Sequence, residues 1–91
     1  MVKKYEGLPF EVKYHKNCQE RIFYPTAPTT ELKWHQDNED RLVELCEPTD
    51  WYIQLDNELP VPFPPKLFIP KNTFHRVIKG VTHLKVKIYF I

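Results

Sequence analysis

The chain has 91 residues, with 13 lysine and arginine residues against 12 aspartate and glutamate residues and a formal net charge of +1. With this balance the chain has no tail of one charge sign that would recruit phosphates or anionic lipids, so nucleic acid and membrane surfaces are not expected as partners. No apolar run approaches the roughly 20 residues of a membrane span, and the first residues lack the apolar segment of a signal peptide. We therefore expect a cytoplasmic protein that forms one domain over residues 1–91.

A chain of this length has little core with which to stabilise itself. It buries only about 60 to 65% of the surface that it exposes when unfolded. We therefore expect additional stability to come from formation of a homodimer, or alternatively from strand exchange or a bound metal ion. Cys18 and Cys46 lack the spacing of a zinc knuckle or a redox pair, and we expect both to be packed thiols.

The composition favours strands and turns, because the chain has nine prolines, only two glycines and many β-branched and aromatic residues. No window of a dozen residues keeps the apolar periodicity of a helix, so at most one short helical turn is expected. Alternating runs bounded by turn residues predict eight strands, at residues 10–14, 21–24, 31–37, 41–46, 51–56, 66–69, 74–78 and 84–91. Strands at this spacing predict an all-β fold, a single antiparallel barrel or sandwich.

Two of the later segments have a specific expected place in this fold. The stretch 59–65 contains four prolines, which lack ladder donors, so it should be an extended surface segment or a barrel edge. A proline-rich ligand for SH3-type partners is the less favoured reading of this stretch. The last run, 84–91, alternates apolar and polar side chains, which indicates a strand with one buried face that closes the fold.

The densest polar cluster, residues 34–41, contains a pair of metal-ligand types. On a strand, His35 and Asp37 would project to the same side. An imidazole nitrogen and a carboxylate oxygen suit Fe(II), Mn(II), Zn(II) or Ni(II), and a distant histidine would complete a facial triad with open positions. His75 fits this place, because residues 67–77 are typical of a strand, a turn and a returning strand.

Two motifs here resemble the signatures of the cupin superfamily. His35-Gln36-Asp37, followed by acidic residues, is similar to the first motif, and Pro70-Lys71-Asn72-Thr73-Phe74-His75 is similar to the second. Asp37 stands where cupins usually have their second histidine, Asn72 replaces the turn glycine, and Lys79 replaces an asparagine. Asn72 is a tolerable exchange because asparagine adopts the left-handed conformation more readily than other non-glycine residues.

The resemblance implies a small single-domain cupin, an RmlC-like double-stranded β-helix or jelly roll. Residues 1–29 would form N-terminal strands and a loop, and residues 30–91 a barrel core that carries both motifs. It also implies that an acidic residue after the first motif can be a fourth metal ligand. Strand parity favours Glu39 for this role, whereas a turn after Asp37 would favour Asp40.

Three further residues are candidates for substrate binding. Gln54 would reach the pocket if the polar face of its strand points inward, although such a face is more often solvated. Arg41 and Arg76 could grip a substrate carboxylate, but an ion pair with Glu39 or Asp40 is favoured.

The residues also have purely structural readings. His35 could be a half-buried histidine without a ligand role, and Asp37 a turn former or a partner of Arg41. His15 and His83 lie in polar loop contexts and are expected to be exposed.

The expected function is therefore a cupin-like protein that binds a divalent metal (Fe, Mn, Zn or Ni) and a small-molecule ligand. Its enzymatic form would be an oxygenase or an isomerase. A 2-oxoglutarate-dependent oxygenase is a minor variant, because Lys85 stands where those enzymes usually have an arginine. The alternative is a non-catalytic mini-cupin that acts as a ligand-binding or assembly module, since no other catalytic motif is present.

Overall fold

The computed structural model of the chain describes residues 2–4, 10–27 and 32–91. These residues form strands and no helix, so none of them belongs to a helix that could cross a membrane. The strands, in chain order, are β1 (Val2–Lys4), β2 (Phe10–Tyr14), β3 (Gln19–Phe23), β4 (Arg41–Leu45), β5 (Tyr52–Leu55), β6 (Val61–Pro62), β7 (Lys66–Ile69), β8 (His75–Ile78) and β9 (Leu84–Phe90). The all-β prediction is confirmed.

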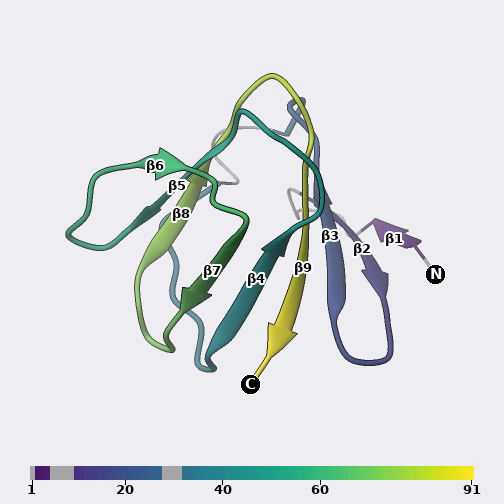
Figure 1. Cartoon of the computed structure of the whole chain (residues 1–91), viewed down its shortest axis with the longest axis horizontal. Helices are drawn as coiled ribbons and strands as arrows, with labels where there is room; N and C mark the ends of the chain where they lie inside the picture. Colours follow the sequence, from purple (N-terminus) through teal and green to yellow (C-terminus); the bar gives the residue numbers. More distant parts are fainter. Residues whose placement is uncertain (1, 5–9, 28–31) are drawn as a thin grey trace.

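The strands form two antiparallel sheets that face each other (Figure 1). The larger sheet has the order β1-β2-β3-β9-β4-β7, and the smaller one has the order β6-β5-β8. β9 pairs with β3 on one side and with β4 on the other, so the last strand joins the N-terminal strands to the rest of the sheet. β7 and β8 follow each other in the chain but lie in different sheets, so the turn between them crosses from one sheet to the other.

The core lies between the two sheets. β9 buries Leu84, Val86 and Ile88, as its alternation predicts, although Phe90 at its end is 41% exposed. Trp51 is fully buried and donates a hydrogen bond from Nε1 to the carbonyl oxygen of Thr82 at 2.6 Å. Because its ring nitrogen has a partner, this tryptophan can fill the core without leaving a polar atom unpaired.

The predicted strand 31–37 and the expected burial of Cys46 differ from the structure, whereas the proline-rich stretch has its expected place. Within residues 32–37 of the predicted strand 31–37, only His35 pairs, in an isolated bridge with His75, and residue 31 lies outside the described residues. The short β6 lies within the proline-rich stretch at the edge of the smaller sheet, which agrees with the expected barrel edge. Both cysteines are free, but Cys46 is exposed and not packed as expected.

The loop between β8 and β9 is held by one carboxylate. Asp50 accepts hydrogen bonds from the backbone N–H groups of Val81 and Thr82 and from the Thr82 hydroxyl. The Val81 bond, followed by the Thr82 bonds, holds the pKa of the Asp50 carboxyl below its usual value. Gly80 lies directly against this carboxylate, and a Cβ atom there would contact it and would lie 2.8 Å from the Asp50 carbonyl oxygen.

We expect Gly80→Ala to destabilise the protein by about 1–3 kcal/mol, because the added methyl group forces the Asp50 contacts apart. Val81→Ala is the control, since Val81 is 81% exposed and keeps its backbone bond to Asp50. The control should change the free energy of unfolding by no more than about 0.5 kcal/mol. Urea denaturation measures both variants, and equal stabilities would contradict the proposed crowding at Gly80.

Candidate metal centre

Backbone hydrogen bonds bring the two motifs together. The N–H of His35 donates to the carbonyl oxygen of His75 at 3.0 Å, and the N–H of His75 donates back to that of His35 at 2.9 Å. The N–H of Asn72 donates to the carbonyl oxygen of Asp37 at 2.7 Å. The segment around residue 36 is therefore fixed against β8 and the turn before it, although it forms no continuous strand.

The turn between β7 and β8 has the backbone conformation that the sequence predicted. Asn72 has φ of 62°, in the left-handed region, where a side chain other than Gly, Asn or Asp is strained. Asn57, with φ of 61°, is the other non-glycine residue with positive φ in the described part of the chain. The replacement of the usual cupin glycine by Asn72 thus preserves the turn that presents its N–H to Asp37.

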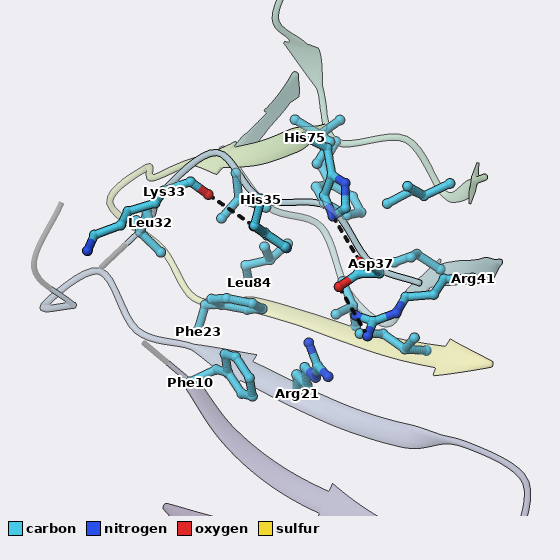
Figure 2. Close-up of a pocket in the computed structure, with 17 residues that line it drawn as sticks. Phe10, Arg21, Phe23, Leu32, Lys33, His35, Asp37, Arg41, His75 and Leu84 are labelled. Carbon is cyan, nitrogen blue, oxygen red and sulfur yellow. Dashed lines mark hydrogen bonds and ion pairs between the residues drawn. The ribbon is translucent and has the colours of Figure 1, made fainter. Parts of the chain in front are cut away.

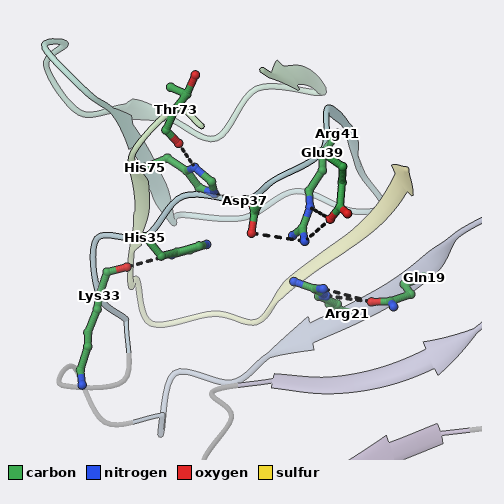
Figure 3. Close-up of polar contacts among 9 residues, drawn as sticks. All are labelled: Gln19, Arg21, Lys33, His35, Asp37, Glu39, Arg41, Thr73 and His75. Atoms are coloured by element: carbon green, nitrogen blue, oxygen red, sulfur yellow. Dashed lines mark hydrogen bonds and ion pairs between the residues drawn. The ribbon is translucent and has the colours of Figure 1, made fainter. Parts of the chain in front are cut away.

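Three ligand-type side chains meet where the motifs join (Figure 3). One ligand atom each from His35, Asp37 and His75 lies within 4.8 Å of the other two, and the two imidazole centroids are 4.3 Å apart. His75 is buried and 5% exposed, the Asp37 side chain is 14% exposed, and His35 is exposed. The group therefore has a buried side and a side that solvent reaches.

Both imidazoles are held through the same ring nitrogen. Nδ1 of His35 lies 3.0 Å from the carbonyl oxygen of Lys33, and Nδ1 of His75 lies 2.8 Å from that of Thr73. A carbonyl oxygen only accepts hydrogen bonds, so each Nδ1 carries a proton. In the neutral form each Nε2 then has a free lone pair, which is the form in which histidine binds metals.

Asp37 has a buried oxygen atom that lacks a hydrogen bond. Its Oδ2 lies 3.3 Å from Nε2 of His75, without the geometry of a hydrogen bond. With the His75 proton on Nδ1, two lone pairs face each other across this distance, which is unfavourable unless a positive charge lies between them. A proton or a metal cation would supply that charge, so the donor chemistry fits a divalent metal ion.

The electrostatic surroundings of His75 favour its neutral form. Burial is the main reason that its pKa lies below the usual value of 6.5, and the positive charge of Arg41 and the nearby His35 act in the same direction. The hydrogen bond to Thr73 and the charge of Asp37 oppose this shift without cancelling it. A histidine that stays neutral at physiological pH is available as a ligand.

Neither candidate for a fourth ligand lies in this group. Glu39 forms an ion pair with Arg41, in which Oε1 of Glu39 lies 2.9 Å from Nη2 of Arg41. Asp40 accepts a hydrogen bond from the backbone N–H of Lys71 at 2.8 Å. The expected ion pair between Arg41 and Glu39 is therefore present. Nη2 of Arg41 also lies 3.3 Å from Oδ1 of Asp37, so the structural reading of Asp37 as a partner of Arg41 holds together with its place in the donor group.

Two predicted substrate-binding residues lie away from the cavity. Arg76 donates from Nε to Oε1 of Gln54 at 3.0 Å, and its guanidinium stacks over the Trp34 ring at 4.9 Å. The neighbouring Ile53 and Val77 line the cavity from the same strands instead. The apolar face of β5 points inward because it covers the core, so the expectation that Gln54 reaches the pocket is not met.

A cavity of about 360 Å³ adjoins the donor group (Figure 2). His35, Asp37, His75 and Arg41 lie on its wall together with apolar side chains from both sheets and from the segments between strands, among them Phe10, Phe23, Leu32, Val43, Ile53 and Phe63. An apolar cavity with a few polar groups gathered at one place is typical of a small-molecule site.

Arg21 also lines this cavity, although neither sequence motif predicts it as a site residue. It lies on β3, on the wall formed by the N-terminal strands, whereas both motifs lie in the later part of the chain. Strand parity could have found it, because Arg21 shares a face with the apolar Phe23 two residues later, which is buried.

The chain matches solved structures, although no protein-family model and no curated protein matches its sequence. Protein NMB1881 from Neisseria meningitidis matches with a TM-score of 0.59 and 14% identity, over 99% of this chain and 88% of that chain. A cupin domain from Bordetella pertussis Tohama I matches with a TM-score of 0.58 and 14% identity, over 97% of each chain. Apo-HppE matches with a TM-score of 0.64 and 11% identity, over 100% of this chain and 53% of that chain. The chain therefore has the cupin fold that its two motifs predicted.

The lowered pKa of His75 should make the metal-free protein less stable in acid. The unfolded chain takes up the proton near pH 6.5, whereas the folded chain takes it up only at lower pH, so stability falls as the pH decreases through this window. His75→Gln should remove this component, and His83→Gln, at an exposed histidine, should keep it. Urea denaturation at several pH values between 7 and 5 measures the free energy of unfolding of each protein. The prediction would be wrong if this free energy changed with pH equally in the wild type and in His75→Gln.

Proposed function

We propose that this cupin-fold chain binds a divalent metal ion through Nε2 of His35, a carboxylate oxygen of Asp37 and Nε2 of His75. The observation that carries the proposal is the buried Oδ2 of Asp37, which lacks a hydrogen bond and faces His75 across 3.3 Å. Both histidines keep Nδ1 on a backbone carbonyl, which orients Nε2 for a ligand role. A cation at this place would relieve the repulsion between Oδ2 of Asp37 and Nε2 of His75.

The donor set favours Fe(II) among the divalent ions. Two imidazole nitrogens and one carboxylate oxygen form the facial triad of non-haem iron enzymes, which leaves coordination positions for other ligands. Mn(II), Ni(II) and Zn(II) accept the same donors and are expected to compete, because affinity alone does not separate such ions. Glu39 and Asp40 have other partners and are not included in the proposed set.

The rest of the pocket orients these ligands and places apolar side chains beside them. Arg41 holds the Asp37 carboxylate through Oδ1, which leaves Oδ2 for the ion. The apolar walls provide a low-dielectric space for a small molecule beside the donor group. When bound, the metal would supply Lewis-acid or redox chemistry to that molecule, as an oxygenase or an isomerase requires.

Removal of a ligand should abolish metal binding. We expect wild-type protein, purified without a histidine tag, to bind about one equivalent of Fe(II) or Mn(II), and His75→Ala and Asp37→Asn to lose it. His83→Ala is the control, because His83 is exposed and lies outside the donor group. Elemental analysis after gel filtration measures the bound metal. The proposal would be overturned if the wild-type protein bound none of Fe(II), Mn(II), Ni(II) and Zn(II).

The turn at Asn72 should affect metal affinity as well as stability. Asn72→Ala and Asn57→Ala each place alanine in the left-handed region and should each destabilise the protein by about 1 kcal/mol. Only Asn72→Ala should also weaken metal binding, because the Asn72 N–H holds the Asp37 backbone. Asn72→Gly should keep the affinity, since glycine adopts this conformation freely. Calorimetric titration with Mn(II) would contradict this reading if both alanine variants bound the metal equally.

A further inference from the structure

Arg21 has an unusual place among the charged residues of the pocket. Its guanidinium donates from Nε and Nη2 to the neutral Oε1 of Gln19, both at 3.1 Å, and lies 4.4 Å from the centre of the Phe10 ring. Within the described residues it has no ion pair with a carboxylate, whereas Arg41 has two. Arg21 therefore brings to the cavity wall a positive charge that contacts no carboxylate of the described residues, and Asp37 and Glu39 act on it only from a distance.

The surroundings of this guanidinium disfavour an unpaired charge. Burial is the main reason that the pKa of Arg21 is lowered to about 10, and the positive charge of Arg41 lowers it further. Arg21 remains protonated at neutral pH despite this shift. A bound anion would stabilise the charged form more than water does in such a half-buried place.

The guanidinium still has donors to offer. Nε and one N–H of Nη2 are used by Gln19, so Nη1 and the second N–H of Nη2 remain. These two nitrogens form one edge of the planar fork, and that edge matches the two oxygens of a carboxylate. Figures 2 and 3 show Arg21 reaching from its strand into the space between the N-terminal strands and the His35, Asp37 and His75 group.

The wall next to Arg21 is largely apolar, although Lys33 and Arg41 also line the cavity. Phe10 and Phe23 pack against each other beside Arg21, with ring centroids 5.0 Å apart, and Leu32 lies on the same cavity. A cavity of about 360 Å³ is at the small end of ligand sites. The shape and chemistry together suit a small molecule with one acidic end and a short apolar body.

We propose that the cavity binds a small organic monocarboxylate, with its carboxylate on Arg21 and its apolar body against Phe10, Phe23 and Leu32. This inference rests on the proposed function in that the acid would be the molecule presented to the metal. The contact with Arg21 is nevertheless a property of the chain itself, and it can be tested with and without metal.

The test compares carboxylates with their neutral amides. Calorimetric titration of the metal-free protein with benzoate and hexanoate, and with benzamide and hexanamide, should show tighter binding of the acids by about tenfold or more. Arg21→Met should remove this preference. Arg76→Met is a closely matched control, because Arg76 also bonds a glutamine and stacks on an aromatic ring but does not line the cavity.

A measurement on the wild type covers the case in which Arg21→Met does not fold. Benzoate should shift the side-chain Nε–H resonance of Arg21 in a ¹⁵N-labelled sample and leave that of Arg76 in place. The inference would be overturned if benzoate shifted both resonances equally, or if it shifted neither of them. So would a folded Arg21→Met that still prefers acids to amides.

The two proposals fail in different ways. Elemental analysis of the same samples reports metal binding independently of the acid. A protein that binds metal but does not distinguish benzoate from benzamide would refute the acid site and leave the metal site intact. A protein that binds benzoate through Arg21 but never binds metal would refute the proposed function and support the carboxylate site.

Discussion

The candidate site depends on a pair of backbone hydrogen bonds between His35 and His75. Each residue donates its N–H to the carbonyl oxygen of the other, at 3.0 and 2.9 Å, so their Cα atoms are held at the spacing of an antiparallel hydrogen-bonded pair. The Asn72 N–H adds a third bond, to Asp37, and prevents the first motif from sliding along the second. Without these bonds the three ligand-type side chains would have no fixed distance from one another.

The charged side chains around this site are not all paired with an opposite charge or a hydrogen-bond donor. Arg41 has two carboxylate partners, Asp37 has one buried oxygen without a hydrogen bond, and Arg21 has no carboxylate partner among residues 2–4, 10–27 and 32–91. Buried polar groups in native proteins are normally paired, and exceptions gather at functional sites. A cation on the side of Asp37 and an anion on the side of Arg21 would together complete the pairing that the described residues leave open.

The cavity also shows why the N-terminal strands matter. The two motifs occupy residues 35–37 and 70–75, but β2 and β3 provide Phe10, Arg21 and Phe23 to the cavity wall. These strands reach the site because β3 pairs with β9, which also pairs with β4. The selectivity of the pocket is thus expected to depend on a part of the chain that carries neither motif.

Local periodicity by itself determined most strand positions and the buried face of β9, because these features depend on neighbouring residues in the chain. The left-handed turn at Asn72 was expected from the resemblance to the second cupin motif, in which Asn72 stands in place of the turn glycine. The periodicity also identified His35, Asp37 and His75, although for a partly wrong reason, since His35 lies in an isolated bridge and not in a continuous strand. Only the tertiary structure decided that Glu39 and Asp40 bind other partners, that Ile53 and not Gln54 faces the cavity, and that Arg21 lies on its wall. Those outcomes depend on which face of a strand meets the core and which distant residue is close enough to pair, and such choices are made by the packing of the two sheets and not by sequence spacing.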